Sequence, residues 1–302
     1  EELDRAEALL AGKLPRPLGS YLYPPSAFDD AQRTANEQAL ADATVAQPAI
    51  AAASLAMLRV LRRLGLKADF AAGHSFGEYV ALTSAEAIDS ASLYNIALRR
   101  GELIAAAAAK GQGGMVAVAA APSVAKQLLA GLMDAWIANE NSPQQTVVAG
   151  TDAALTTLVE RCQQQKLRAA RLPVSCGFHS PLVADAATAL GEVLAAQNWS
   201  TPRQTVFANT TGQAYTGSSS EIVEQLTKHL SSPVRFQDEI EALYAAGART
   251  FVEVGPHNVL TGLIGNILGD RPHVALATDM RGRSGLVQLA HTIGQLLVHG
   301  VD

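Results

Sequence analysis

The sequence predicts an α/β protein whose sheet is mostly parallel. Near both ends of the chain, short apolar runs alternate with helix-like segments, and a β-α-β-β-α-β pattern interrupts this alternation in the middle. The chain has 302 residues, of which 48% are apolar and 17% charged, so it can bury a sizeable core. We therefore expect a large body built from residues 1–114 and 181–302, with residues 115–180 inserted as a small subdomain.

Composition and charge narrow the classes of function. The net charge is -5 and the 23 lysines and arginines are scattered, which argues against a nucleic-acid partner. Cys162 and Cys176 lack metal-type spacing and favour a reducing, cytoplasmic location. Apolar stretches such as residues 103–109 are far shorter than the ~20 residues of a membrane-spanning helix, so we expect no membrane insertion. The chain starts at Glu1 without a methionine, from which we expect a part of a longer polypeptide.

The first part of the chain predicts a helix, a strand, a sharp turn and further helices. Pro48 is suited to the first turn of a helix, and Gly65 to the position just past its end. The segments expected here are a helix over residues 48–64, a strand over 70–72, a helix over 78–83 and a helix over 91–109.

The pattern changes between residues 115 and 174, where the segments follow the order of a split βαβ unit. Such a unit forms a small independent sheet with two helices on one face. The expected strands lie at 115–120, 135–138, 146–149 and 167–174, and the helices at 123–132 and 153–164.

The last part of the chain returns to the alternating pattern. Ser180 is suited to cap a helix that has Pro181 at its first position and continues to about residue 197. A strand over 205–208, a helix over 221–230 and a strand over 251–254 follow.

Ser75 is the candidate nucleophile. In Gly73-His74-Ser75-Phe76-Gly77 the two glycines permit a strained turn that projects the serine hydroxyl between a strand and a helix. The backbone N–H of Phe76 can then donate to a developing oxyanion, an interaction worth roughly 3 kcal/mol in the transition state. An ordinary glycine-rich turn is the alternative explanation.

A serine hydroxyl needs a base that takes its proton. His179 directly precedes a predicted helix start, where the positive end of the helix dipole favours a neutral imidazole. His257, in a turn after a predicted strand, is the second candidate. For either one, the alternative is a core histidine with ordinary structural partners.

Arg100 lies on the apolar face of the helix predicted over residues 91–109, whereas Arg99 points elsewhere. A guanidinium on an inward face is costly unless a carboxylate meets it, often in a bidentate pair. The partner is either a protein Asp or Glu or the carboxylate of a substrate. A side chain that extends to the surface is the third explanation.

Together these residues resemble the malonyl-CoA:acyl-carrier-protein transacylases and the acyltransferase domains of polyketide and polyunsaturated fatty-acid synthases. The resemblance runs over nearly the whole chain. It rests on Ala46-Gln47-Pro48-Ala49, Gly73-His74-Ser75-Phe76-Gly77-Glu78, Arg100-Gly101, Gly113-Gly114-Met115, Asn141-Ser142-Pro143, Gly177-Phe178-His179-Ser180, Pro233-Val234-Arg235-Phe236 and Glu253-Val254-Gly255-Pro256.

The resemblance implies a mechanism. Ser75 attacks the thioester of malonyl-CoA, His179 is the general base and Arg100 binds the free carboxylate of the malonyl group. The acceptor is the phosphopantetheine thiol of an acyl carrier protein, the domain itself binds no cofactor, and a ketosynthase flanks it in the same polypeptide.

The resemblance also implies roles for neighbouring residues. The backbone carbonyl of Arg235 orients the catalytic histidine, and His74 and Asn141 line the pocket. Phe178 resembles the malonyl-selective synthase domains, in which a bulky ring crowds an α-methyl group, a discrimination worth about 1–3 kcal/mol.

For the fold, the resemblance implies a large α/β-hydrolase-like body with an inserted ferredoxin-like βαββαβ subdomain. The active site is then expected in the cleft between the two. The family's amino-terminal glycine-glutamine-glycine segment, which carries the second oxyanion donor, has no match in this sequence.

Two other functions fit parts of the sequence. A serine esterase or thioesterase of the α/β-hydrolase type shares the serine motif but needs an acid between serine and histidine, for which Asp134 and Asp152 are the candidates. A non-catalytic docking domain of a synthase is the second alternative. The presence of Ser75, His179 and Arg100 together argues against it.

Overall fold

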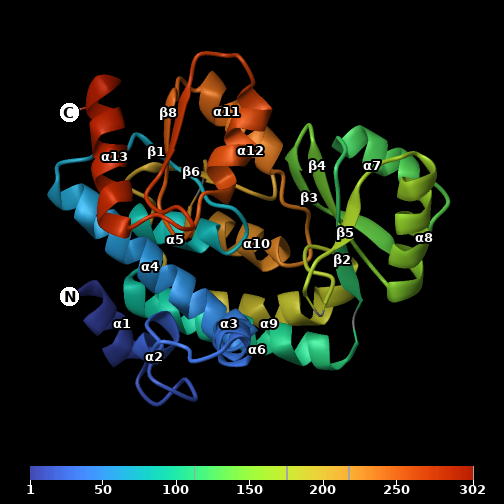
Figure 1. Ribbon diagram of the computed structural model, residues 1–302, viewed down its shortest axis with the longest axis horizontal. Helices are drawn as coiled ribbons and strands as arrows, with labels where there is room; N and C mark the ends of the chain where they lie inside the picture. Colours follow the sequence, from blue (N-terminus) through green and yellow to red (C-terminus); the bar gives the residue numbers. More distant parts are fainter. Residues whose placement is uncertain (112, 175, 217, 302) are drawn as a thin grey trace.

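The computed structural model describes residues 1–111, 113–174, 176–216 and 218–301, which form a larger and a smaller part side by side (Figure 1). The larger part carries two short sheets surrounded by helices. Its parallel pairs are β1 (Phe70–Ala71) with β6 (Thr205–Ala208) and β8 (Thr250–Glu253) with β9 (Val274–Ala277), while β7 (Gln213–Ala214) joins β6 antiparallel. The expected parallel pairing is therefore present in two small sheets.

Helices make up most of the larger part. The helices are α1 (Glu2–Leu10), α2 (Leu18–Leu22), α3 (Asp30–Ala41), α4 (Ala43–Arg63), α5 (Gly77–Ser84), α6 (Ser90–Ala109), α9 (Ala184–Ala195), α10 (Ser219–His229), α11 (Phe236–Ala245), α12 (Val259–Leu268) and α13 (Gly285–Val298). Of these helices, α4, α5, α6, α9 and α10 were predicted from the sequence, and α1, α2, α3, α11, α12 and α13 were not.

The smaller part has the β-α-β-β-α-β order that the sequence predicts. Its strands pair antiparallel in the order β3-β4-β2-β5, and both helices cover one face of the sheet (Figure 1). Val116, Val148 and Leu155 lie in the core between sheet and helices. The elements are β2 (Gly114–Val118), α7 (Pro122–Leu128), β3 (Ala135–Ser142), β4 (Gln145–Gly150), α8 (Asp152–Gln164) and β5 (Ala169–Arg171).

Strand β3 is longer than expected and connects the two parts. Its second half carries Asn139 and Asn141, so the apolar run from which the strand was predicted stops at Ala138. The backbone of Val234 donates to the Ala138 carbonyl and accepts from the N–H of Glu140, both at 2.8 Å. The larger part thus binds the edge of the small sheet through its backbone.

Helix α4 begins earlier than predicted. The side chain of Asp42 accepts a 2.9 Å hydrogen bond from the N–H of Thr44, so Pro48 lies inside the helix and not in its first turn. By length and composition alone α4 could cross a bilayer. In the structure it is a core helix that packs against α6, and its Ala51 and Ala52 are fully buried.

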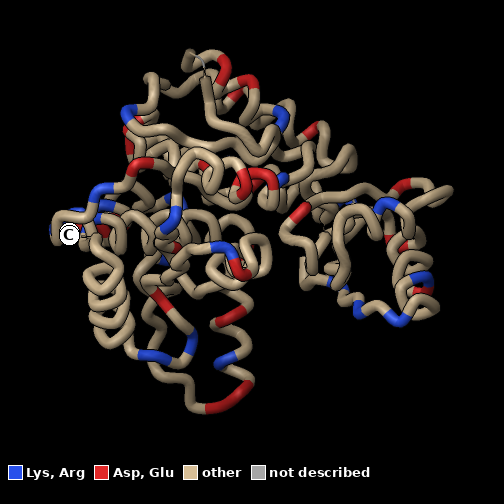
Figure 2. Tube along the Cα trace, turned by 90° about the horizontal axis from the view of Figure 1, so that it is seen from above, with Lys and Arg blue, Asp and Glu red and all other residues tan. Residues whose placement is uncertain are grey.

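Basic and acidic residues alternate over both parts of the described chain (Figure 2). Exposed residues of opposite charge pair with one another, as Arg171 and Asp152 do at 2.6 Å.

The Ser180 side chain accepts a hydrogen bond from the N–H of Leu182 at 3.3 Å. This cap starts a short 3₁₀ turn (Pro181–Val183) that leads into α9, as the Ser-Pro pair predicts.

The turn between β1 and α5 folds back tightly on itself. A Cβ placed on Gly73 would lie only 2.1 Å from the carbonyl carbon and oxygen of Gly77, whereas a Cβ on Gly77 would have no atom within 4 Å. The two glycines of the serine motif therefore have different roles. Gly73 is required by the close backbone approach, and Gly77 is the first residue of a helix.

This difference predicts opposite outcomes for two alanine substitutions. Gly73→Ala forces the backbone of the turn apart, so we expect the melting temperature to fall by about 6–12 °C, which corresponds to roughly 3 kcal/mol for a domain of this size. Gly77→Ala should keep or raise stability, because alanine is favoured over glycine in a helix by up to about 1 kcal/mol. Thermal unfolding followed by circular dichroism measures both variants, and equal losses would contradict the distinction.

Candidate active site

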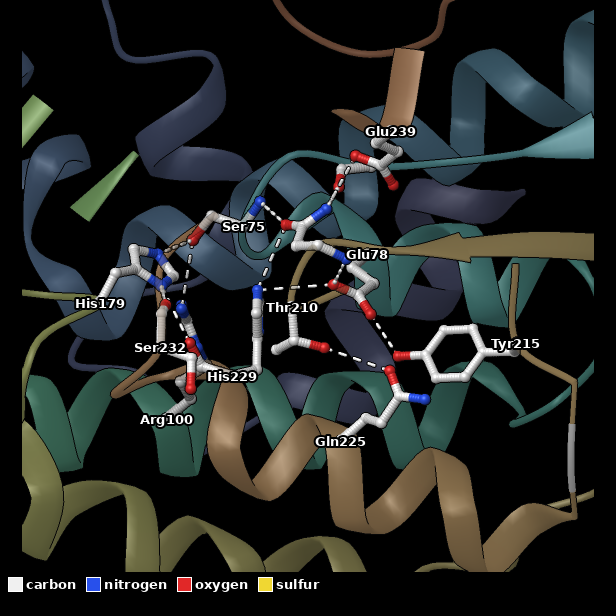
Figure 3. A network of polar contacts seen from close by, with 12 residues as sticks. Ser75, Glu78, Arg100, His179, Thr210, Tyr215, Gln225, His229, Ser232 and Glu239 are labelled. Atoms are coloured by element: carbon white, nitrogen blue, oxygen red, sulfur yellow. Dashed lines mark hydrogen bonds and ion pairs between the residues drawn. The ribbon is translucent and has the colours of Figure 1, made fainter. Parts of the chain in front are cut away.

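Ser75 lies in the turn before α5, with its backbone in the left-handed region at a φ of 52°. Its hydroxyl oxygen is 2.8 Å from Nε2 of His179, a residue 104 positions away in the sequence (Figure 3). The N–H of Phe76 makes no hydrogen bond within the described chain, so it is free to donate to an oxyanion. A strained backbone of this kind is typical of catalytic residues, since the surrounding fold must hold it.

His179 also has a left-handed backbone, with a φ of 57°, and is only 3% exposed. Its Nδ1 lies 3.0 Å from the carbonyl oxygen of His229 and 3.1 Å from that of Ser232. Carbonyl oxygens only accept hydrogen bonds, so Nδ1 carries the proton. The lone pair of Nε2 therefore faces the hydroxyl of Ser75.

The environment keeps His179 uncharged. Burial, and after it the nearby positive charge of Arg100, lower the pKa of His179 to about 3. The imidazole is thus neutral at physiological pH and can accept a proton from Ser75. A protonated imidazole at this position could not act as a base.

The expectation that the carbonyl of Arg235 orients His179 is wrong. The accepting carbonyls belong to His229, the last residue of α10, and to Ser232 in the turn that follows. The final carbonyls of a helix have no partner within the helix, which leaves them free for the imidazole. Arg235 instead directly precedes α11 at its N-cap position, and its side chain pairs with Asp238 at 2.6 Å.

Arg100 is 4% exposed and points toward Ser75. Its Nη1 donates to Oε1 of Gln47 at 2.8 Å, and its Nη2 lies 3.4 Å from the Ser75 hydroxyl oxygen. Among the described residues no carboxylate lies within ion-pair distance of Arg100, and its Nε has no hydrogen-bond partner. A buried guanidinium without a protein carboxylate suits an anionic ligand.

The helices bring Gln47 and Arg100 together through a close contact. A Cβ on Gly101 of α6 would lie 2.4 Å from the carbonyl oxygen of Ala43 at the start of α4, so only glycine allows this approach. The side chain of Gln47 then reaches across to Arg100. This explains why a glycine follows the arginine in the sequence.

His74 and Asn141 meet where the two parts of the protein join. Asn141, from β3 of the smaller part, accepts a 2.8 Å hydrogen bond from Nε2 of His74. Burial lowers the pKa of His74, so this imidazole is also neutral. Phe178 is half-buried and packs against apolar residues of both parts.

A pocket of about 660 Å³ opens beside His179 between the two parts, and it includes Lys126, Trp136, Glu140 and Arg235 in its lining. A larger pocket of about 820 Å³ lies elsewhere, between the end of α4 and the start of α6, and shares no lining residue with the Ser75 site. Of these two pockets, only the one beside His179 includes a residue of the Ser75–His179 pair in its lining, and neither is lined by Ser75 or Arg100.

The other sequence candidates lie apart from this pair. His257 is exposed, and its backbone N–H donates to Asp279 at 2.7 Å. The side chain of Asp152 pairs with Arg171, and the backbone carbonyl of Asp134 accepts from Thr151. Neither aspartate hydrogen-bonds to His179, whose Nδ1 donates to two backbone carbonyls.

No cluster of metal-ligating side chains occurs in the described ranges. Cys162 and Cys176 are both buried and free. Burial raises the pKa of the Cys176 thiol to about 12, so it is protonated and unreactive at neutral pH.

Sequence reasoning missed a set of buried polar residues behind Ser75. Asn209 follows β6, and Glu78, His229 and Glu239 surround it, all of them almost fully buried. A single asparagine in an irregular segment has no recognisable spacing. Its place at the carboxyl end of a predicted strand, where α/β proteins tend to gather functional residues, was the one indication that could have found it.

Comparison with known proteins relates this site to a family. The family model described as acyl transferase domain matches residues 28–301. A polyunsaturated fatty acid synthase protein of Thraustochytrium is 30% identical over 99% of this chain, which spans 11% of that protein. The malonyl CoA-acyl carrier protein transacylase of Bacillus subtilis is 36% identical over 72% of this chain and 71% of its own length.

Solved structures agree with the sequence comparison. The acyltransferase domain from the second module of the salinomycin polyketide synthase superposes with a TM-score of 0.87, at 27% identity, over 100% of this chain and 67% of that chain. The malonyl CoA-acyl carrier protein transacylase from Clostridium perfringens gives a TM-score of 0.85 at 27% identity, over 100% of this chain and 92% of its own. The chain belongs to the acyl transferase domain family.

Proposed function

We propose that this chain moves a malonyl group from malonyl-CoA, through an ester on Ser75, to the phosphopantetheine thiol of an acyl carrier protein. One observation carries the proposal: the Ser75 hydroxyl lies between a neutral imidazole and a buried guanidinium that lacks a protein carboxylate among the described residues. The names of the Bacillus and Clostridium relatives support the choice of malonyl and of a carrier protein.

In the first half-reaction the Ser75 oxygen attacks the thioester carbon while its proton passes to Nε2 of His179. The resulting oxyanion accepts a hydrogen bond from the N–H of Phe76. As the tetrahedral intermediate collapses, the bond from carbon to sulfur breaks, and the proton on His179 goes to the departing thiolate of coenzyme A. Malonyl remains as an ester on Ser75.

In the second half-reaction the thiol of the carrier-bound phosphopantetheine enters the same site. It gives its proton to His179 and attacks the ester carbon, and the bond from carbon to Ser75 oxygen then breaks. The proton returns from His179 to the serine, which regenerates the free site. The hydrogen bonds from Nδ1 of His179 to the carbonyls of His229 and Ser232 would stabilise the imidazolium formed in each half.

Arg100 links recognition of the substrate to activation of the base. A malonyl carboxylate would occupy the free side of its guanidinium, next to the acyl carbon held at Ser75. The positive charge of Arg100 is one of the causes that lower the pKa of His179. A bound carboxylate offsets this charge, which raises the basicity of His179 when the correct substrate is present. Acetyl has no carboxylate and lacks this effect.

The remaining features concern selectivity and context. Phe178 directly precedes His179 and packs against apolar residues of both parts, and we propose that its ring disfavours an α-methyl group on the acyl chain. The large and small parts are proposed to correspond to an α/β-hydrolase-like body and a ferredoxin-like subdomain, with boundaries near residues 114 and 180. The chain spans 11% of the Thraustochytrium synthase protein. We therefore also propose that it is one domain of a multidomain synthase. In this proposal the synthase is cytoplasmic and a ketosynthase flanks the domain in the same polypeptide.

A serine esterase is the alternative function, since it shares the serine motif. Such enzymes orient the histidine with an acid. Here backbone carbonyls hold Nδ1 of His179, and an esterase gives no reason for a guanidinium beside Ser75 that no described carboxylate pairs with.

The first prediction concerns the covalent intermediate. Incubation with malonyl-CoA should add the mass of one malonyl group to the intact protein, and peptide mapping should place it on Ser75. Ser75→Ala should carry no adduct. If the wild-type protein remains unmodified while it is folded, the transferase function is wrong and the docking-domain alternative gains support.

The second prediction concerns the acyl group. Arg100→Ala removes the partner of the malonyl carboxylate, so kcat/KM for malonyl-CoA should fall roughly 100-fold, or about 3 kcal/mol, while transfer from acetyl-CoA is kept or improved. Arg99→Ala is the matched control, because Arg99 is exposed and pairs with Glu102. Equal losses for malonyl and acetyl would assign Arg100 a structural role.

The third prediction concerns pH. With a pKa of about 3, His179 should stay neutral, with its proton on Nδ1, throughout the range from pH 8 to about pH 5. Nitrogen chemical shifts of the imidazole measure this directly, with His179→Gln to assign the signal. Protonation with a midpoint near 6.5, the ordinary value for histidine, would contradict the effect of burial.

A further inference from the structure

Asn209 lies behind the nucleophile at the end of β6 and is fully buried. We propose that its carboxamide is a positioning residue that sets Ser75 and, through His229, the base His179 relative to one another. The proposal rests on the proposed function, because it assigns Asn209 a part in the acylation of Ser75.

The contact with the nucleophile involves both ends of the carboxamide. Oδ1 accepts from the backbone N–H of Ser75 at 2.6 Å, and Nδ2 donates to the carbonyl of Gly73 at 2.5 Å. These two backbone groups lie on either side of His74 in the strained turn. A flat group with an acceptor and a donor side by side can satisfy both, and it thereby holds Ser75 at its positive φ.

The contact with the base runs through His229. Its Nε2 lies 3.3 Å from Oδ1 of Asn209 and 3.5 Å from the carboxylate of Glu78. Its backbone carbonyl oxygen accepts a hydrogen bond from Nδ1–H of His179, with 3.0 Å between nitrogen and oxygen. The same oxygen of Asn209 therefore contacts the turn that carries Ser75 and the residue that orients His179 (Figure 3 labels Ser75, His179 and His229).

The backbone of Asn209 is fixed as firmly as its side chain. Its N–H donates to Glu78 at 3.1 Å, and its carbonyl accepts from the N–H of Arg235 at 2.9 Å. Nδ2 donates a second hydrogen bond, to Glu239 at 3.0 Å. Burial raises the pKa of Glu78 to about 7 and also raises the pKa of Glu239.

These contacts single out Asn209→Asp as the informative change. Aspartate has the same shape, but a carboxyl group has at most one proton to donate, whereas the Asn209 carboxamide donates to both the Gly73 carbonyl and Glu239. Asn209→Ala removes both contacts. Thr210→Val is the matched control, because Thr210 is the next residue in the chain and its hydroxyl donates to Gln225 at 3.1 Å without contact to Ser75.

The test uses a fluorophosphonate probe, which reports on the nucleophile and its base whatever the natural acyl group is. The Ser75 oxygen bonds to phosphorus as the phosphorus–fluorine bond breaks, fluoride leaves, and the serine proton passes to His179. We expect the labelling rate constant to fall at least 30-fold in Asn209→Asp and Asn209→Ala and to stay within threefold in Thr210→Val. For malonyl-CoA, kcat should fall similarly while KM changes less than threefold, because Arg100 is untouched.

A merely structural role would lower the folded fraction and leave the labelling rate of the folded molecules unchanged, so circular dichroism accompanies each measurement. Labelling within threefold of wild type in either folded Asn209 variant would overturn the proposal. In wild-type protein the backbone amide proton of Ser75 should resist hydrogen exchange, and rapid exchange would overturn it too, even if a variant fails to fold. Wild-type labelling without a malonyl adduct would instead refute the proposed function alone.

Discussion

The hydrogen bond between Ser75 and His179 depends on a backbone that the chain would not adopt alone. Both residues have positive φ values, which residues other than glycine, asparagine and aspartate rarely take. For Ser75, the close approach of Gly73 to Gly77 and the start of α5 impose this geometry. For His179, the two carbonyls at Nδ1 and the cap by Ser180 hold the ring. The strain is tolerated because each residue is held from several sides.

The charge of Arg100 is the second constraint. Burying a guanidinium is expensive, and the protein compensates with the Gln47 hydrogen bond and the nearby faces of Phe76 and Tyr79 instead of a carboxylate. This incomplete compensation leaves the guanidinium available to an anion, and its charge adds to the larger effect of burial in lowering the pKa of His179. In the proposed reaction the substrate completes the ion pair, so recognition and catalysis share one electrostatic arrangement.

The site also depends on how the two parts meet. The Asn141 side chain at the end of β3 contacts His74, and the backbone of the same strand pairs with Val234. Val234 follows the turn whose Ser232 carbonyl holds His179. A shift of the smaller part would therefore affect the pocket wall and the segment that orients the base at the same time.

Several local features of this protein could be predicted from its sequence. The serine motif, the Ser-Pro helix start after His179, the inward position of Arg100 and the βαββαβ order all follow from short-range rules on turns, caps and periodicity. The groups that hydrogen-bond to these residues could not be predicted from such rules. The carbonyls that orient His179 lie 50 or more residues further along the chain, and every backbone residue has a carbonyl, so the sequence contains nothing that marks them.

Arg235 was chosen in their place by resemblance, and the packing of α10 and α11 decided otherwise. Asn209 was missed for a related reason. Its importance comes from the atoms that surround it, which are supplied by the turn after β1 and by α5, α10 and α11. Residue types and their spacing determined which side chains of this protein could react. Only the tertiary structure decided which neutral and charged groups are buried beside those side chains. The reason is that burial and hydrogen bonding depend on contacts between segments that are distant in the sequence.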